Sequence, residues 1–214
     1  MTPRRPAPAF FPGLLGLIVA LIAWVGAPSG PARALAEPVI ALGDMSIGDP
    51  EAKVTIIEYA SFSCPHCANF HATVLPRLQE DYIGTGRVRL IHREVFFDRS
   101  SFWAALVARC AGPERYFGIA GLIYQGQEGW ARAADPVAAA DALRRIGLVA
   151  GLEAERVDAC MRDAEGAQAL YDRAEADVKA DAVEATPTLI VNGTKHRNMP
   201  YEELRAVIDA ALAE

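Results

Sequence analysis

Two cysteines three positions apart are the residues best suited to chemistry in this sequence. Cys64 and Cys67 enclose only Pro65 and His66, in the stretch SFSCPHCANF. Such a pair can bind a metal ion, form an inert disulfide or exchange electrons with other thiols. A zinc site needs two further ligands, and His71 could complete only a three-ligand cluster, so we expect no metal. A disulfide across so short a loop is strained and easily reduced, which favours redox chemistry.

The position of Cys64 predicts an unusually acidic thiol. The motif follows a β-branched run and precedes a helical pattern, so Cys64 should lie where unpaired backbone N–H groups favour an anion. Pro65 suits the first helical position, and His66 adds a polar or cationic ring. Cys67 should lie one turn deeper, covered and protonated. A Cys64 pKa of about 4.5 would raise the reduction potential by about 70 mV at pH 7, which predicts a disulfide that is easily donated.

The elements that must position this motif are strands and helices in alternation. Three apolar, β-branched runs predict strands at residues 53–60, 87–97 and 186–193. A helix at 67–84, kinked by Pro76, connects the first two and implies that they pair in parallel. Residues 99–183 contain five helical stretches and no convincing strand, and 200–214 form a terminal helix. The sequence therefore predicts an α/β fold.

The first 36 residues have the three parts of a secretory signal. Arg4 and Arg5 precede an uncharged apolar run at 10–27, and Ala-Leu-Ala at 34–36 precedes Glu37. An uncleaved membrane anchor is the alternative, and both place the remainder outside the cytoplasm. Without this segment the chain has 178 residues (214 minus 36) and a net charge of −9, from 18 basic and 27 acidic side chains. Such an acidic chain without a basic patch argues against nucleic acid as a partner.

All four cysteines lie in the exported part, which predicts disulfide bonding. Three pairings are open. The short separation favours Cys64 with Cys67 and leaves Cys110 with Cys160, fifty positions apart. The second pair would join two helices of the helical block, and two buried free cysteines are the alternative.

The runs IIEYASFSCPHC and ATPTLIVNG, with helices between them, resemble the DsbA-like thiol–disulfide oxidoreductases of the thioredoxin superfamily. The resemblance spans residues 43–214. It implies a thioredoxin fold with a helical insertion between the second strand and the cis-proline strand. It also implies that Cys64 is the exposed nucleophile and Cys67 the buried resolving cysteine. Pro187 would be the cis-proline facing the disulfide, and Thr186 would lend its backbone to a bound substrate strand.

The same resemblance places an acid, Glu58, beneath the disulfide. If it is buried without a cationic partner, its pKa should be raised and it could exchange a proton with Cys67. The alternative is a glutamate at a strand edge with its carboxylate in water. The implied organisation is a signal peptide at 1–36, an extension at 37–52, the first half of the thioredoxin fold at 53–98, the helical insertion at 99–183 and the second half at 184–214.

These features predict a monomeric, periplasmic disulfide oxidase without a cofactor. It would donate the Cys64–Cys67 disulfide to folding secreted proteins, and a quinone-linked membrane oxidase of the DsbB kind would reoxidise it. Because Thr186 is also common in reductase and isomerase branches, an enzyme kept reduced by a membrane donor is one alternative. A metal-handling module using Cys64, Cys67 and His71, and a redox-inactive peptide-binding adaptor, are the others.

Overall fold

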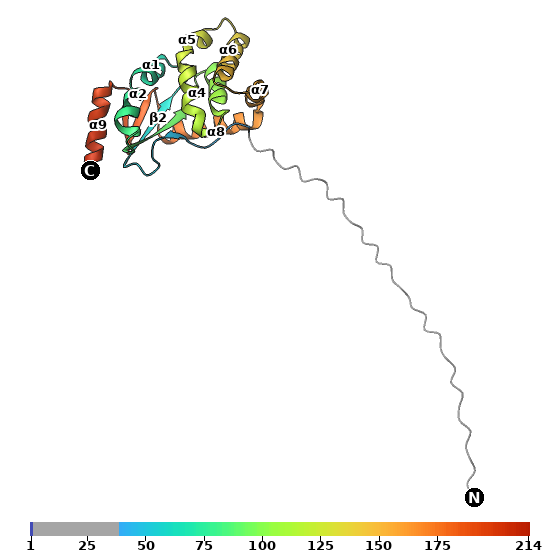
Figure 1. Ribbon diagram of the computed structural model, residues 1–214, viewed down its shortest axis with the longest axis horizontal. Coiled ribbons are helices and arrows are strands. Elements are labelled where there is room, and N and C mark those ends of the chain that lie inside the picture. The colour runs from blue at the N-terminus through green and yellow to red at the C-terminus, as the bar shows by residue number, and fades with distance from the viewer. Residues whose placement is uncertain (2–38) are drawn as a thin grey trace. The chain divides into compact units, whose positions relative to one another are not determined.

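The structure of the protein is a computed structural model that describes Met1 and residues 39–214 (Figure 1). The predicted signal peptide and membrane anchor lie outside the described residues. Within the part that is described, no helix is both long enough and apolar enough to cross a membrane.

Five strands form one sheet in the order β1-β3-β2-β4-β5. Strands β2 and β3 pair in parallel, as predicted, and every other pair is antiparallel. The α/β fold is therefore confirmed. The strands are β1 (Met45–Ile47), β2 (Val54–Ala60), β3 (Val88–Glu94), β4 (Thr188–Val191) and β5 (Thr194–Arg197).

The sequence did not predict β1 or β5. Strand β1 has only three residues, and β5 reads Thr-Lys-His-Arg, so neither shows an apolar alternation. We interpreted Asn192-Gly193 as the end of a strand, but it is the turn of a hairpin that joins β4 to β5. Both residues have positive φ, 44° and 86°, as a two-residue hairpin turn requires.

Three helices cover one face of the sheet and leave a polar residue at its centre. They are α1 (Pro65–Thr73), α2 (Leu75–Leu78) and α9 (Tyr201–Ala213). Because side chains alternate along a strand, Glu58 faces the same way as Val54 and Ile56. Apolar side chains fill the space between this face and the helices, among them Phe70, Leu78, Val88, Leu90, Leu189, Val191, Leu204 and Ile208.

The helix predicted at 67–84 consists of three pieces. Helix α1 ends at Thr73, Pro76 lies in the first turn of α2, and a π-helix, η1 (Gln79–Ile83), follows. The predicted break at Pro76 is therefore present, since proline is tolerated in a first turn and not in a helix interior.

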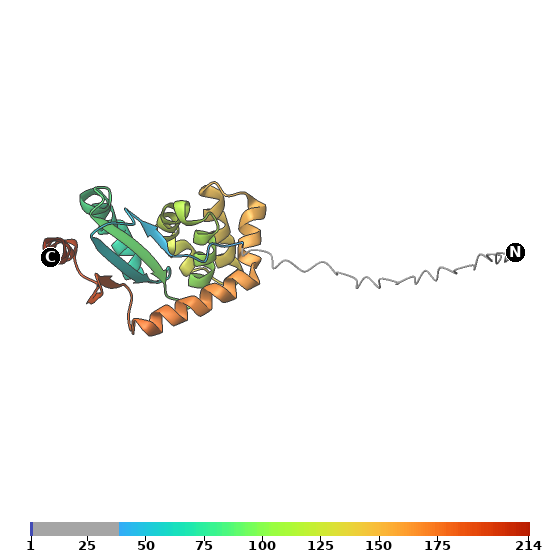
Figure 2. The same ribbon diagram turned by 90° about the horizontal axis from the view of Figure 1, so that it is seen from below.

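Six helices between β3 and β4 form the helical block. They are α3 (Arg99–Arg109), α4 (Pro113–Gln125), α5 (Gln127–Ala131), α6 (Pro136–Val149), α7 (Ala154–Arg162) and α8 (Ala164–Ala180). Helix α5, with five residues, is too short to show a periodicity and was not predicted. Figure 2 shows α8 extending from the block beneath the sheet. There the Tyr59 hydroxyl donates to Asp181 Oδ2 at 2.5 Å, just beyond the end of α8.

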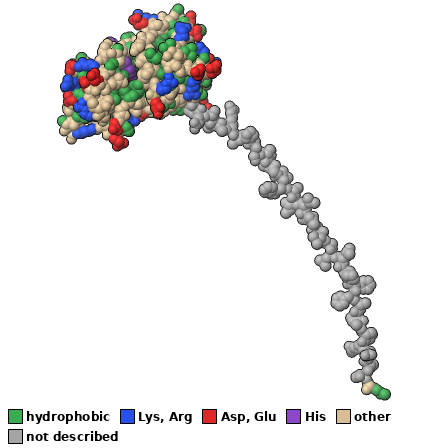
Figure 3. All heavy atoms as spheres, in the orientation of Figure 1, with side chains coloured by type: hydrophobic (Ala, Val, Ile, Leu, Met, Phe, Trp, Pro, Cys, Tyr) green, Lys and Arg blue, Asp and Glu red, His purple; other side chains and the backbone are tan. Residues whose placement is uncertain are grey.

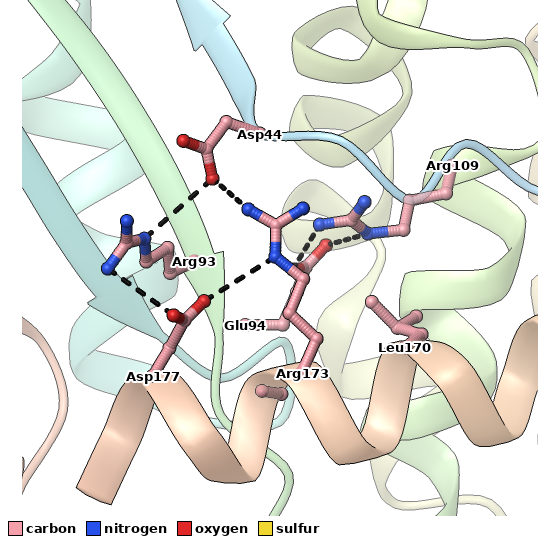
Figure 4. Close-up of a pocket in the computed structure, with 8 residues that line it drawn as sticks. Asp44, Arg93, Glu94, Arg109, Leu170, Arg173 and Asp177 are labelled. Carbon is pink, nitrogen blue, oxygen red and sulfur yellow. Dashed lines mark hydrogen bonds and ion pairs between the residues drawn. The ribbon is translucent and has the colours of Figure 1, made fainter. Parts of the chain in front are cut away.

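An ion-pair cluster fastens α8 to β3 and to the segment before β1. Asp44 pairs with Arg93 and Arg173, and both arginines also pair with Asp177 (Figure 4). Elsewhere, on the face shown in Figure 3, basic and acidic side chains are interspersed with apolar ones. The cluster links segments far apart in the chain and so holds the block against the sheet.

Candidate active site

Cys64 lies where β2 gives way to α1. It is the N-cap residue of α1, with extended backbone angles (φ −80°, ψ 119°), and Pro65 is the first helical residue. Both thiols are free, which is the reduced form of the pair. Cys67 is fully buried, and Cys64 itself is only 8% exposed. The prediction of an exposed Cys64 is therefore wrong, because its side chain packs inward and its thiol donates to the Thr186 carbonyl at 3.5 Å.

The two thiols differ strongly in acidity. The pKa of Cys64 is lowered from 9.0 to about 5, chiefly by a hydrogen bond from the Cys67 thiol. Burial opposes this shift, while the Thr186 hydroxyl and the backbone N–H groups of Cys67 and His66 support it. Burial raises the pKa of Cys67, and so do its neighbours Cys64 and Glu58. Cys64 therefore favours the thiolate, whereas Cys67 keeps its proton.

His66 differs from the prediction in how it acts. Its side chain is exposed, and its contribution to the acidity of Cys64 comes from its backbone N–H. Pro65 is exposed as well. The effect predicted for the imidazole ring is therefore an effect of the helix N-terminus, where the first N–H groups have no helical partner.

The loop before β4 faces Cys64. The Thr186–Pro187 peptide bond is cis, the geometry implied by the family resemblance. In the structure the Thr186 carbonyl accepts from the Cys64 thiol, and among the described residues the Thr186 hydroxyl has no hydrogen-bond partner. A thiolate cannot donate to the carbonyl, so the hydroxyl is the group that can turn its donor toward the anion.

Glu58 is fully buried beneath the motif, and it has the partner that the sequence did not reveal. Its Oε2 lies 3.0 Å from His71 Nε2, and the His71 side chain is 4% exposed. Burial alone would raise the pKa of Glu58, but the charge and hydrogen bond of His71 lower it below the ordinary 4.5. The condition for a raised pKa, burial without a cationic partner, is therefore not met, and the alternative of a carboxylate in water is wrong.

A second set of buried polar groups lies next to Glu58 and His71. Glu58 of β2 lies beside His92 in the register with β3. Tyr116 donates to Glu94 at 2.8 Å and lies 2.8 Å from His92 Nδ1. Arg109 holds both oxygens of Glu94 at 2.7 Å (Figure 4). The guanidinium overcomes the effect of burial and lowers the pKa of Glu94 to about 2.

Sequence reasoning missed these residues, although one signal was available. His92 and Glu94 follow Val88 and Leu90 at a spacing of two, so the alternation along the strand already placed them on the buried face. His71, four positions after Cys67, lies on the same face of α1. No comparable signal points to Tyr116, whose helix comes from the helical block.

Three of these groups also form a set that could hold a metal ion. The ligand atoms of Glu58, His71 and His92 all lie within 4.8 Å of one another, and all three residues are buried. We predicted no metal, and this set was not considered. His71 Nε2 is already bound to Glu58 Oε2, and the two nitrogens of His92 face the hydroxyls of Tyr116 and Tyr124, so these atoms form a hydrogen-bonded network and we do not assign them as metal ligands.

Gln127 of α5 connects the helical block to the turn that carries Cys64. Its buried amide nitrogen donates to the carbonyls of Phe62 and Cys64, at 2.6 and 3.0 Å. The Cys64 carbonyl also accepts from the Ala68 backbone N–H at 3.1 Å, whereas Gln127 is the donor that satisfies the buried Phe62 carbonyl, and together these bonds fix the backbone at the start of α1.

Cys110 and Cys160 form a disulfide that joins the end of α3 to α7. Both are buried within the block. The pairing of Cys110 with Cys160 that the sequence suggested is therefore confirmed.

The chain belongs to the thioredoxin family, whose model matches residues 41–210. Among solved structures, α-DsbA1 of Wolbachia pipientis superposes with a TM-score of 0.74 and 25% identity, over 81% of this chain and 92% of that one. BdbD of Bacillus subtilis in its oxidised form gives a TM-score of 0.72 at 21% identity, over 82% and 96%. The fold is therefore a DsbA-like thioredoxin fold with a helical insertion, as the sequence predicted.

A curated relative from Rickettsia bellii, named "Putative protein-disulfide oxidoreductase", is 30% identical over 172 residues. The match covers 80% of this chain and 65% of that relative. Matches to four other Rickettsia proteins cover 61 to 63% of their lengths. The chain thus spans less than two thirds of the length of these curated relatives.

Proposed function

We propose that this protein is an exported thiol–disulfide oxidase that donates the Cys64–Cys67 disulfide to proteins folding outside the cytoplasm. The observation that carries the proposal is the unequal acidity of the two thiols at the start of α1. At pH 7 a thiol with a pKa of about 5 is about 100 times more often ionised than protonated. Compared with a thiol of the ordinary pKa, 9.0, this preference raises the reduction potential of the two-electron couple by about 60 mV. A stable Cys64 thiolate makes the reduced form favourable and the disulfide easy to donate.

The proposed reaction has two exchanges. A substrate thiolate attacks Cys64 Sγ, the Cys64–Cys67 bond breaks, and Cys67 leaves with the electron pair and takes a proton. A second substrate thiolate then attacks the substrate sulfur of the mixed disulfide, and Cys64 leaves as a thiolate. The Thr186 carbonyl, 3.5 Å from Cys64 Sγ, supports a role for this loop in holding the substrate strand beside Cys64. The buried carboxylate of Glu58 supports a role in proton exchange with Cys67.

We further propose that the protein acts as a monomer outside the cytoplasm and that a quinone-linked membrane oxidase restores its disulfide. The signal-like sequence at 1–36 supports export. The disulfide in the helical block supports an oxidising compartment, since such bonds are rare in reducing ones.

Equilibration with glutathione tests the direction of the reaction. An oxidase should have a midpoint potential above about −200 mV, whereas a value near about −270 mV would indicate a reductase. A reduced peptide with two cysteines should be oxidised by the wild type. With glutathione disulfide as the oxidant, Cys67→Ala should stop at a Cys64–glutathione mixed disulfide with release of one glutathione thiolate, and Cys64→Ala should neither form this adduct nor oxidise the peptide.

A further inference from the structure

The hydrogen bond between His71 and Glu58 leaves the two oxygens of a buried carboxylate in different states. Glu58 Oε2 is held by His71 Nε2 at 3.0 Å, whereas Oε1 has no hydrogen-bond partner among the described residues. Because the pKa of Glu58 is lowered, its carboxylate is ionised near neutral pH and only accepts, so His71 Nε2 is the donor. An unpartnered oxygen of a buried carboxylate is costly to keep, which points to a role in proton transfer.

The groups facing Glu58 from the neighbouring elements make Cys67 the candidate proton donor. From α1, Cys67 lies one turn before His71 on the helix face that contacts Glu58, and the charge on Glu58 raises the pKa of Cys67. From α4, the pKa of Tyr124 is raised well above 10.0, so this hydroxyl keeps its proton. From β3, burial lowers the pKa of His92 to about 4, so this ring is neutral.

The more distant charges of the network are already paired. Tyr116 donates to the ionised Glu94, so it accepts from His92 Nδ1, and His92 Nε2 faces the Tyr124 hydroxyl at 3.4 Å. Arg109 neutralises Glu94. His71 is therefore the group hydrogen-bonded to Glu58, and it lowers the pKa of Glu58 more than His92 does.

Building on the proposed function, we propose that His71 is a positioning residue that keeps Glu58 ionised and directs its free oxygen, Oε1, to accept the proton of Cys67. The step matters most when the disulfide is re-formed. Cys67 must then lose a proton that burial and its neighbours hold firmly. Glu58 supplies the base, and His71 keeps that base available across the physiological pH range.

Oxidation of the two cysteines by glutathione disulfide illustrates where the electrons and the proton go. The Cys64 thiolate attacks one sulfur of the oxidant, a Cys64–glutathione disulfide forms, and one glutathione thiolate leaves. Cys67 then gives its proton to Glu58 Oε1 while its sulfur attacks Cys64 Sγ. The Cys64–Cys67 bond forms, the second glutathione thiolate leaves with the electron pair, and Glu58 later releases the proton to water.

The test follows closure of this mixed disulfide by acid quench and mass spectrometry, with reduced protein and excess glutathione disulfide from pH 5 to pH 8. In the wild type the closure rate should be flat, because Glu58 is ionised throughout this range. In His71→Gln burial should raise the pKa of Glu58, so its closure rate should fall about tenfold or more at pH 5 and recover as the pH rises. Glu58→Gln should have no plateau, its rate rising about tenfold per pH unit with the thiolate fraction of Cys67.

His196→Gln, on strand β5, is the matched control and should keep the wild-type profile. A flat profile in His71→Gln overturns the inference alone, whereas a wild type that never closes its disulfide overturns the proposed function as well. Stoichiometric zinc in the purified wild type, lost in His71→Gln, would assign the cluster to metal binding and also overturn the inference.

A second measurement uses the wild type alone, in case His71→Gln does not fold. Infrared difference spectra against Glu58→Gln should show an ionised Glu58 in the reduced protein at pH 5. A protonated carboxyl signal that disappears in Glu58→Gln would contradict the role given to His71.

Discussion

The two cysteine pairs of this protein are equally buried but lie in opposite electrostatic settings. Cys64 and Cys67 are 8% and 0% exposed, and Cys110 and Cys160 are 1% and 0% exposed, so exposure does not distinguish them. Cys64 caps the N-terminus of α1, where unpaired N–H groups favour a thiolate, whereas Cys110 caps the C-terminus of α3, where the helix dipole disfavours an anion. The helix end is therefore one difference between the reactive pair and the structural pair.

The polar neighbours sharpen the contrast. Around Cys64 and Cys67 lie a hydroxyl, a carboxylate and backbone N–H groups that respond to charge on sulfur. Cys110 and Cys160 belong to the same apolar cluster as Cys64 and Cys67, but the polar group described beside their sulfurs is the Arg156 carbonyl, 3.4 Å from Cys110 Sγ, which cannot donate to a thiolate. The comparison teaches that the reactivity of a buried cysteine is set by the donors around it.

The largest expected effect is the loss of activity when Cys64 is removed, compared with retained activity when Cys110 and Cys160 are removed. Cys64→Ala should abolish oxidation of a peptide dithiol, because no other described thiol is placed to be an acidic nucleophile. The double variant Cys110→Ala/Cys160→Ala should keep the activity. Loss of peptide oxidation in the double variant, with its fold intact by circular dichroism, would contradict the structural role given to Cys110 and Cys160.

The same double variant should lose stability. Removing a disulfide that spans fifty residues should lower the free energy of unfolding by about 4 kcal/mol in the chain-entropy model. Urea unfolding of the double variant and the wild type, both with Cys64 and Cys67 reduced, measures the difference. A change below about 1 kcal/mol would show that the disulfide is not a major support of the block.

The reactive pair should make stability depend on pH. The folded pKa of Cys64, about 5, is below its ordinary value of 9.0, so the thiolate stabilises the reduced form fully above pH 9. This contribution shrinks as the pH falls from 9 toward 5 and is absent below 5. The difference in melting temperature between reduced and oxidised protein should follow this course, whereas a difference independent of pH would contradict it.

The smallest expected effect concerns Gln127, which links the helical block to the turn that carries Cys64. Gln127→Ala removes the donor for the Phe62 carbonyl and one of two donors for the Cys64 carbonyl, and should cost about 2 kcal/mol of unfolding free energy. Gln125→Ala, an exposed glutamine on α4, is the control and should cost less than about 0.5 kcal/mol. Equal costs for the two variants would mean that Gln127 does not support the turn.

The sequence predicted the elements whose signal is local. Strands β2, β3 and β4 and the helices of eight or more residues follow apolar periodicity, and the start of α1 follows from a strand, Cys64 and Pro65. Strands β1 and β5 and helix α5 were missed because they are too short or too polar to show a period.

The site was predicted where it depends on neighbours in the chain and missed where it depends on packing. The acidity of Cys64 arises chiefly from the Cys67 thiol, three positions on, with support from the backbone N–H groups of the helix start, so the motif predicted its direction. The partner of Glu58 could not be predicted, because His71 reaches it only through the way α1 packs on β2. Likewise, Gln127 and Tyr116 come from the helical block, and sequence spacing says nothing about which side chains such a block brings to the sheet.

The central claim is that the helix start and its neighbours hold Cys64 as a thiolate, and ultraviolet titration of the reduced protein tests it most directly. Thiolate absorbance, measured against Cys64→Ala as the blank, should reach half its final value near pH 5. A midpoint near 9.0, the ordinary value for cysteine, would contradict both the electrostatic account and the oxidase that it supports.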